Sequence, residues 1–292
     1  MKLIQVVSNG LKLETLLINT LNALRHLTKA TSEKMVEESH IYLREKKIVR
    51  HQIFVKKGTV VSILSPDSLY AKMPFQLSSG HVVYEDSDII VVDKPSGLST
   101  QSTQTPGEDH LFAAVIAHLT EQTPSKLAYV GLHHRLDRDT SGLVLMTKKS
   151  SANKSISDQF KDRKIVKKYL AIVQGDKPAQ SKWKVEAPIS RLHGAKDFRF
   201  GINHKKGDEA VTLFNYVKSI DQNHHLIECQ PITGRTHQIR IHLASCQIPI
   251  VGDRLYGIKS DKRLQLYAHN LQFEHPKTGE KMNLSSKRSL DI

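Results

Sequence analysis

The stretch HHRLDRDTSGLVLMT, residues 133–147, joins a polar turn to an apolar strand. A turn that leads into a buried strand can project a carboxylate into a cleft, and Asp137 is the carboxylate in that position. Arg135 and Arg138 flank it, and their positive charges favour its ionised form, which suits a nucleophile or an anion that pairs with a cation. The alternative is a solvated turn with local salt bridges, which composition alone favours.

The same stretch opens with two adjacent histidines, His133 and His134. Adjacent residues of an extended segment point in opposite directions, and no third ligand follows at the spacing of a metal site. We therefore do not predict a metal centre here.

Outward from this stretch, short strands are interspersed with a few helices. The strand 88–92 runs into the turn DKPSG, in which Pro95 and Gly97 stop further pairing. Helices are expected over 108–122, over 151–163 and from near Arg235, and strands over 143–147, 169–173, 183–189, 209–220, 225–232 and 269–274. Hairpin-like neighbours outnumber regular strand–helix alternation. This pattern predicts an α+β fold on a mixed, largely antiparallel sheet.

A second candidate segment is PITGRTHQIRIHLAS, residues 231–245. A helix that begins after Gly234 would place Arg235 on the same face as the apolar residues four and eight positions later. Arg235 would then reach into a neighbouring cleft, and Arg240 would point elsewhere. A basic amphipathic helix on the surface is the alternative.

A third candidate segment is KIVKKYLAIVQG, residues 164–175, in which Tyr169 heads an apolar strand behind three lysines. This tyrosine is either a core residue with its hydroxyl at the rim or an aromatic side chain that stacks on a base.

The first 80 residues differ from the rest in charge. They contain 12 Lys and Arg against 6 Asp and Glu, whereas the rest of the chain contains 31 against 23. Leucines between 16 and 27 recur at helical spacing, the segment 41–64 is typical of short strands joined by basic turns, and 65–80 has the composition of a linker. We predict a small domain over 1–75 and a larger domain over 81–292.

The whole chain is strongly basic. Its 292 residues include 43 Lys and Arg against 29 Asp and Glu, a net charge of +14, which favours polyanions through phosphate contacts. Solubility is the alternative reason for such a charge. Cys229 and Cys246 form neither a disulfide framework nor a CxxC pair, and the sequence has no signal-peptide pattern and no run of 18 apolar residues. We expect a cytoplasmic protein with no membrane partner.

Four motifs follow one another along the larger part of the chain: VVDKPSGL (91–98), HRLDRDTSGL (134–143), KKYLAIVQG (167–175) and GRTHQIRIHL (234–243). Two flanking elements, VGDRLYG (251–257) and LYAHNLQFEHPKTGE (266–280), follow them. Together they resemble the RluA-type family of pseudouridine synthases over residues 85–285. The resemblance implies an enzyme that isomerises uridine to pseudouridine in ribosomal or transfer RNA.

The resemblance also implies roles for single residues. The aspartate of HRLD, Asp137, is the catalytic residue, and Arg135 of the same motif contacts RNA. Tyr169 packs against the target base and accepts the proton at carbon 5. Arg235 pairs with Asp137 and fixes its orientation.

Two more residues, His134 and Lys94, are assigned to RNA contact on the same grounds. The resemblance implies no cofactor and no metal. RNA, ribosomal or transfer, is therefore the partner we expect, and we expect the chain to be a monomer without an obligate protein partner.

The implied reaction explains why so small a set of residues suffices. The N-glycosidic bond breaks, the uracil turns, and carbon 5 joins the same sugar. A stacked uridine cannot do this, so it must be flipped into a pocket at a cost of roughly a few kcal/mol, which phosphate contacts offset. Three routes stay open, because the carboxylate can add to the sugar, add to the ring, or remove the 2′ proton to give a glycal.

Two other functions fit parts of the sequence. An RNA-binding assembly factor on the same fold would have no need of Asp137, Tyr169 and Arg235, yet all three are present. A glycosidase would need a second acid facing Asp137 across the scissile bond, and Asp139 lies only two residues away on the same wall. We therefore predict the synthase.

The first 65 residues resemble a degenerate S-four-like RNA-binding module. The resemblance rests on KMVEESHIYLREKKIVRHQIFVKKGTVVSIL, in which Arg44–Glu45–Lys46 replaces the usual asparagine–glycine turn. The alternative is a basic extension that packs on the larger domain. A second departure from the family follows Leu98, where the segment STQSTQTPG lacks the histidine that is common in the family. We expect this difference to affect substrate entry rather than the chemistry.

Overall fold

The structure of the chain is a computed structural model. It describes residues 2–8, 10–25, 40–43, 46–48, 53–65, 75–102, 109–123, 125–192, 199–258, 261–288 and 290.

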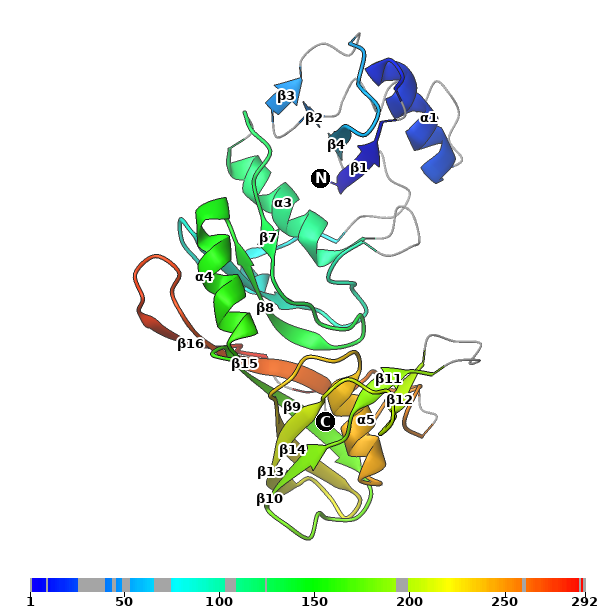
Figure 1. Cartoon of the computed structure of the whole chain (residues 1–292), viewed down its shortest axis with the longest axis vertical. Helices are drawn as coiled ribbons and strands as arrows, with labels where there is room; N and C mark the ends of the chain where they lie inside the picture. The colour runs from blue at the N-terminus through cyan, green and yellow to red at the C-terminus, as the bar shows by residue number, and fades with distance from the viewer. Residues whose placement is uncertain are drawn as a thin grey trace. The chain divides into compact units, whose positions relative to one another are not determined.

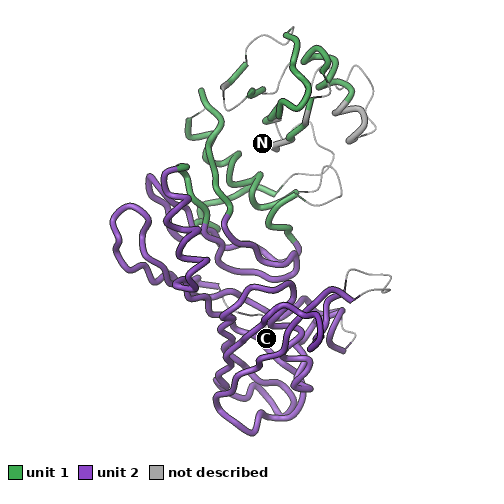
Figure 2. The backbone as a smooth tube through the Cα atoms, in the orientation of Figure 1, with its two compact units in different colours: residues 1–82, 98–132, 146–150 green, residues 83–97, 133–145, 151–292 purple. Residues whose placement is uncertain are grey.

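Two compact units divide the chain, and both are discontinuous in sequence (Figure 2). Unit 1 holds residues 1–82, 98–132 and 146–150, and unit 2 holds residues 83–97, 133–145 and 151–292. The predicted division near residue 80 coincides with the first change of unit. Residues 98–132, in contrast, join the N-terminal residues rather than the rest of the predicted larger domain.

Unit 1 contains a four-stranded antiparallel sheet. Its strands are β1 (Lys2–Val7), β2 (His40–Leu43), β3 (Lys46–Ile48) and β4 (Val60–Ser65), in the order β1-β4-β2-β3. The strands predicted within 41–64 are thus confirmed, and β1 is an addition. The replaced turn at Arg44–Glu45 lies outside the described residues, as do positions 66–74 of the predicted linker.

The described part of unit 1 contains two helices. Helix α1 (Leu13–Arg25), predicted from the leucine spacing, buries Leu13, Leu16 and Leu17 in a cluster with apolar residues of β2 and β4. Helix α3 (Leu111–Gln122) packs against β1, and the side chain of His110 caps it by accepting a hydrogen bond from the Ala113 amide at 3.1 Å. The short strand β7 (Gly131–Leu132) follows.

Unit 2 is built on a large mixed sheet (Figure 1). Its strands are β5 (Val82–Glu85), β6 (Ile89–Lys94), β8 (Ser141–Thr147), β9 (Val166–Gln174), β10 (Lys182–Glu186), β13 (Val211–Ser219), β14 (His224–Pro231), β15 (Leu266–Glu274) and β16 (Lys281–Ser285). The order is β10-β13-β14-β9-β15-β8-β6-β5, with β16 also paired to β15 and β7 paired to the end of β8. β15 and β8 run parallel, and the pairs from β10 to β15 are antiparallel. The predicted α+β class with a mixed, largely antiparallel sheet is confirmed.

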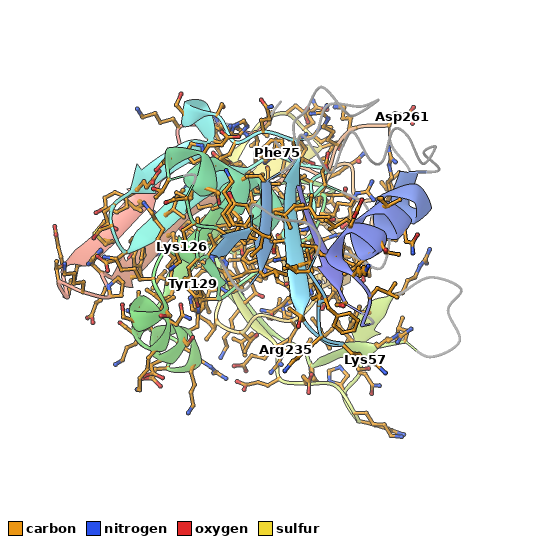
Figure 3. All side chains as sticks on the ribbon, turned by 90° about the horizontal axis from the view of Figure 1, so that it is seen from above. Lys57, Phe75, Lys126, Tyr129, Arg235 and Asp261 are labelled. Carbon is orange, nitrogen blue, oxygen red and sulfur yellow. The ribbon has the colours of Figure 1, made fainter. Side chains whose placement is uncertain are left out.

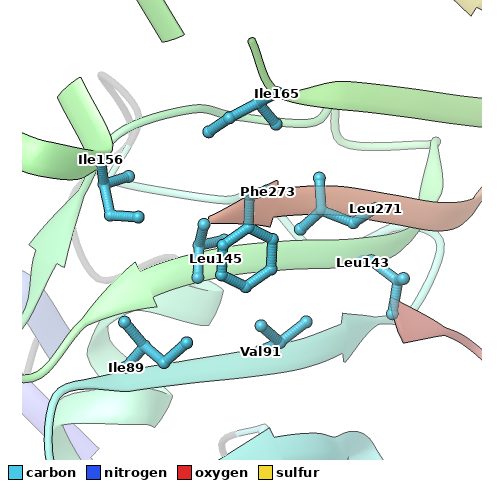
Figure 4. Close-up of a cluster of buried hydrophobic side chains, with 8 residues drawn as sticks. All are labelled: Ile89, Val91, Leu143, Leu145, Ile156, Ile165, Leu271 and Phe273. Atoms are coloured by element: carbon cyan, nitrogen blue, oxygen red, sulfur yellow. The ribbon is translucent and has the colours of Figure 1, made fainter. Parts of the chain in front are cut away.

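The remaining elements of unit 2 cover this sheet. Helix α4 (Ser150–Lys161) contributes Ile156 to a buried cluster with residues of β6, β8 and β15 (Figure 4). Helix α5 (Gln238–Ser245) packs against β13 and β14, and the small hairpin of β11 (Ile189–Arg191) and β12 (Phe200–Ile202) lies beside α5.

One glycine lets the strand that follows the HRLD motif enter the sheet. Gly142 has a φ of +119°, and a Cβ atom at this position would overlap the backbone of Ala268 in β15. Only glycine fits this close approach. The polar turn at 134–141 is therefore fixed at one end by the pairing of β8 with β15.

Candidate active site

The turn DKPSG holds the loop that carries Asp137. Lys94 Nζ and the Gly97 amide both donate to the Arg138 carbonyl, at 3.0 and 2.9 Å, and Ser96 Oγ donates to the Asp139 carbonyl at 2.7 Å. Three hydrogen bonds from one turn therefore fix the backbone on the C-terminal side of Asp137.

Lys94 is an internal residue. Its side chain is fully buried, and its ammonium also donates to the Pro95 carbonyl at 3.0 Å. Burial lowers its pKa to about 7, although the carboxylates of Asp137, Asp139 and Asp93 favour the charged form. The structure does not place Lys94 as the predicted RNA contact, because a side chain with no exposed surface supports the loop from inside.

His134 supports the other side of the loop. Its Nε2 accepts a hydrogen bond from the Leu145 amide at 2.9 Å, and its ring lies 5.0 Å from the ring of Phe160. Burial, with smaller contributions from the charges of Lys167 and His133, lowers its pKa to about 3. The neutral imidazole of His134 uses its Nε2 to hold the backbone at Leu145 and thereby positions the loop. The structure therefore does not place His134 as the predicted RNA contact.

The carboxylate of Asp137 faces a narrow pocket within unit 2. The cavity is about 90 Å³ and is lined by Arg135, Leu136, Asp137, Thr140, Lys167, Tyr169, Pro231, Thr233, Gly234, Arg235, His237, Gln238, Ile239, Arg240 and Leu266. Three of the predicted site residues, Arg135, Tyr169 and Arg235, thus lie around Asp137. Among the described residues that line the pocket, Asp137 is the only acidic one.

Arg240 brings its guanidinium group close to Asp137. Its Nη1 lies 4.0 Å from Asp137 Oδ2, while its Nε and Nη2 donate to the two carboxylate oxygens of Asp253 at 2.8 and 2.7 Å. The side chains of Arg240 and Asp253 are 5% and 1% exposed. Burial opposes ionisation of Asp253, but the hydrogen bonds and charge of Arg240 outweigh it and lower the pKa of that carboxyl. A two-point hydrogen-bonded pair thus aims the third guanidinium nitrogen at Asp137.

Arg235 does not pair with Asp137, and this prediction is wrong. Its Nε donates to the Glu209 carbonyl at 2.9 Å, and its Nη1 lies 3.7 Å from Asp208 Oδ2. Helix α5 begins at Gln238, so Arg235 lies in a turn and the helical spacing used for the prediction does not apply to it. Arg235 lines the pocket with a side chain that is 40% exposed, where a substrate can reach it.

Gln238 fixes the turn that carries Arg235. Its Oε1 accepts from the Arg235 amide at 3.0 Å and from Thr233 Oγ1 at 2.7 Å. Its Nε2 donates to Val211 and Thr212 of β13, at 2.9 Å in both cases. Gln238, the first residue of α5, thereby attaches the turn at 234–236 to the sheet.

Tyr169 also lines the pocket. It lies on β9 with 8% of its surface exposed, and Lys167, two residues earlier on the same face, also lines the pocket. Burial, followed by the charge of Asp137, raises the pKa of Tyr169 well above its usual range. Its hydroxyl is therefore protonated at neutral pH. Burial also lowers the pKa of Lys167.

The prediction missed three residues at this site: His237, Arg240 and Asp253. His237 has a left-handed φ of 56°, its Nε2 lies 3.9 Å from Asp137 Oδ2, and its Nδ1 lies 2.9 Å from Tyr256 Oη. Burial lowers the pKa of His237, and the charge of Asp137 opposes this shift. The sequence did contain a signal for the pair of Arg240 and Asp253. The basic motif GRTHQIR is followed by an acid in VGDRLYG, and such an arrangement allows a buried charge pair.

A sequence model described as RNA pseudouridylate synthase matches residues 88–245, which is more than half of the chain. The chain belongs to the RNA pseudouridylate synthase family. It is similar to an uncharacterised RNA pseudouridine synthase of Mycoplasma genitalium, with 33% identity over 97% of this chain and 91% of the relative. It is also similar to the ribosomal large subunit pseudouridine synthase C of Rickettsia felis, with 32% identity over 89% and 88%. The predicted RluA-type recognition is confirmed.

Solved structures agree on the fold of this pseudouridine synthase. Human RNA Pseudouridylate Synthase Domain Containing 1 matches with a TM-score of 0.58 and 23% identity, over 73% of this chain and 86% of that chain. Human RNA Pseudouridylate Synthase Domain Containing 4 matches with a TM-score of 0.57 and 24% identity, over 72% and 88%. The family match and the relatives of about 32–34% identity, rather than these structures, show that the protein is an RNA pseudouridine synthase, an isomerase that acts on RNA.

Membrane-spanning helices and clusters of metal-ligating side chains are both absent from the described residues. None of the helices in the described ranges is long and apolar enough to cross a membrane. Within the same ranges, His, Cys, Asp and Glu side chains do not gather in threes as metal ligands would. Independence of metals and cofactors stays a prediction, and it is tested below.

Proposed function

We propose that Asp137 is the catalytic carboxylate of this synthase and that ribosomal RNA is its substrate. The observation that carries the first part is the isolation of Asp137 in its pocket. It is the only acid among the described lining residues, with Arg240 at 4.0 Å and the buried Tyr169 also in the pocket wall. A reaction that needs one carboxylate has one candidate there.

Arg240 and Tyr169, the neighbours of Asp137, have different proposed roles. Arg240, held by Asp253, orients the carboxylate of Asp137. The raised pKa of Tyr169 makes its phenolate scarce at neutral pH, and a base with a pKa far above the working pH is seldom in its active form. This favours packing of Tyr169 against the uracil over its predicted role as the proton acceptor at carbon 5.

Base flipping is the proposed mode of access. A cavity of about 90 Å³ with a buried wall admits a base that has left its stack rather than a paired helix. Arg135 and Arg235 line the pocket with exposed or part-exposed side chains, so they are the proposed contacts for the phosphates around the flipped nucleotide. These contacts offset the cost of unstacking.

The names of two relatives support ribosomal RNA over transfer RNA as the substrate. Relatives from Rickettsia felis and Buchnera aphidicola, 32% and 34% identical, are ribosomal large subunit pseudouridine synthases C. We also propose that residues 1–75 supply RNA affinity rather than chemistry, since the pocket lies wholly in unit 2. The proposed working form is a cytoplasmic monomer without an obligate protein partner.

Mapping of pseudouridines in cellular RNA tests this function. Three strains are compared: one with the wild-type gene, one with the gene deleted, and one that carries the Asp137→Asn allele. We expect one or a few ribosomal RNA sites to lose pseudouridine in both altered strains. Loss confined to transfer RNA would overturn the substrate proposal, and retained modification in the Asn strain would overturn the role of Asp137.

A further inference from the structure

A second cavity lies within unit 1, and the described reaction does not use it. This cavity, called here the unit 1 groove, is about 570 Å³ and is lined by Gln5, Lys56, Lys57, Gly58, Thr59, Val60, Ser62, Phe112, Ile116, Leu127, Ala128, Tyr129 and Val130. Its volume falls in the range of roughly 300–1,000 Å³ that is usual for ligand sites. Lys57 and Tyr129, one from each wall, can be located in Figure 3.

One wall of the groove is a rigid turn that presents two lysines. Ser8 holds this turn, because its amide donates to the Thr59 carbonyl at 2.8 Å, its carbonyl accepts from the Gly58 amide at 2.8 Å, and its Oγ donates to the Val55 carbonyl at 2.9 Å. Gly58 takes a φ of +85°, which a glycine adopts without strain. Lys56 and Lys57 are exposed on this turn.

The other wall combines the aromatic rings of Phe112 and Tyr129 with apolar residues. Both rings are half-buried, at the start of α3 and in the loop after it. Thr120 fastens this loop, since its Oγ1 donates to the Ile116 carbonyl at 2.7 Å and accepts from the Ala128 amide at 3.0 Å. Both walls are thus fixed by internal hydrogen bonds.

The charge of the groove identifies its occupant. None of the described lining residues is acidic, and neither Lys56 nor Lys57 has an acidic partner in the described part of the chain. Two unopposed ammonium groups beside two aromatic rings match a single-stranded nucleic acid, in which phosphates alternate with bases that stack on aromatic side chains. An apolar peptide would leave both lysines unmatched.

We propose that the unit 1 groove holds unpaired nucleotides of the substrate RNA, with phosphates at Lys56 and Lys57 and a base against Tyr129 or Phe112. The proposal rests on the proposed contribution of residues 1–75 to RNA affinity, and it adds residues of α3 and its following loop to that role. The amide of Gln5 and the hydroxyl of Thr59 face the same space and can donate to base edges.

Binding by the full-length protein tests the proposal with two probes, a ten-nucleotide oligouridylate and a ten-base-pair RNA duplex. Lys56→Gln with Lys57→Gln should weaken binding of the oligouridylate and flatten the dependence of log affinity on log salt by roughly 1.4, which is about 0.7 for each lost contact to a single strand. Lys277→Gln with Lys281→Gln removes the same charge from exposed positions of unit 2 and should leave the salt dependence within error.

Variants of Tyr129 test the stacking part. Tyr129→Leu should weaken oligouridylate binding by about 10-fold, whereas Tyr129→Phe keeps the ring and should stay within about 2-fold of wild type. Equal losses for both Tyr129 variants, or no loss for Leu, would overturn stacking in the groove. A duplex that binds as tightly and responds equally to the lysine changes would overturn the requirement for unpaired RNA.

Turnover separates this proposal from the proposed function. At saturating RNA, the lysine and Tyr129 variants should form pseudouridine at the wild-type rate, since none of them lines the pocket of Asp137. If the lysine pair and its Lys277/Lys281 control behave alike, the groove is not an RNA site, whatever the result at Asp137. Failure of the proposed function would instead appear as turnover that survives the loss of the Asp137 carboxylate.

Discussion

The pocket around Asp137 and the unit 1 groove use their charges in different ways. In the pocket, Arg240 is 5% exposed and bound at two points by Asp253, and the loop of Asp137 is tied down by the buried Lys94. In the groove, Lys56 and Lys57 lie exposed on a fixed turn. Chemistry at one bond needs groups held in place to a fraction of an ångström, whereas affinity for a flexible strand needs accessible charge. Changes in the pocket should therefore cost rate and stability, and changes at exposed cations should cost affinity.

The largest effect is expected for Arg240→Met. Asp253 would remain buried without its partner, so the free energy of unfolding should fall by about 3–5 kcal/mol. Asp137 would also lose the group that orients it, so kcat should fall by about 100-fold. Denaturant unfolding and single-turnover rates measure the two losses.

A double variant distinguishes positioning from simple structural support. Arg240→Met combined with Asp253→Asn removes the unpaired buried charge, so it should regain most of the lost stability while kcat stays low. Recovery of kcat together with stability would show that Arg240 acts only by holding the fold.

Lys94→Met should have the next largest effect on rate. The variant loses two hydrogen bonds to carbonyl groups but also removes a buried ammonium, and these opposing effects should leave the free energy of unfolding within about 2 kcal/mol of wild type. A less firmly held Asp137 loop should lower kcat by about 10-fold. An unchanged kcat at full saturation would show that Lys94 does not position the loop that carries Asp137.

The same variant has a distinct pH dependence. Because the pKa of Lys94 is lowered to about 7 in the folded protein, the unfolded chain binds more protons between pH 7 and its ordinary value of 10.5. Stability from this group therefore rises with pH across that window. The difference in unfolding free energy between wild type and Lys94→Met should grow in favour of wild type from pH 7 to pH 9, and a constant difference would contradict the burial of a titrating lysine.

Arg235→Gln should have a smaller effect, confined to binding. Its side chain is 40% exposed and pairs with groups away from Asp137, so KM should rise about 3- to 10-fold with kcat unchanged. The salt dependence of log affinity should flatten by roughly 0.7 to 0.9. Lys277→Gln is the charge-matched control. A fall in kcat with KM unchanged would return Arg235 to the catalytic role that the sequence suggested.

Removal of metals should have the least effect. The proposed chemistry uses the carboxylate, the phenol and the guanidinium of the chain, so dialysis against a strong chelator should leave the rate unchanged once magnesium is restored for RNA folding. A loss that only zinc reverses would contradict this expectation.

The sequence located Asp137 but misassigned its partners, and the reasons are physical. Motif order places Asp137, Tyr169 and the GRTHQIR segment in one site, and the structure agrees. The start of α5 decides between Arg235 and Arg240, and it lies three residues after Arg235. Element boundaries depend on tertiary contacts such as those of Gln238, so a pattern of apolar residues does not fix them.

Other features depend on residues far apart in the chain. The sequence predicts Lys94 as a polar residue of a turn. Its burial depends on the distant segment around Arg138, whose carbonyl accepts its hydrogen bond. Strand β1 exists through its pairing with β4, more than fifty residues later. The unit 1 groove likewise needs the turn at 56–60 and the loop at 127–130 to face one another. A local sequence pattern does not predict contacts between segments that are so far apart in the chain.

The most direct test of the account replaces Asp137 by Asn and measures pseudouridine formation in a single turnover with enzyme in excess. Asp139→Asn, two residues away and exposed, is the matched control for charge. We expect the Asp137 variant to bind RNA within about 2-fold of wild type and to form no product, because its pocket offers no other acid among the described residues, while the Asp139 variant forms product normally. Product formed by the purified Asp137→Asn protein, with Asp137→Ala agreeing and deamidation excluded by mass spectrometry, would contradict the assignment of Asp137 as the catalytic group.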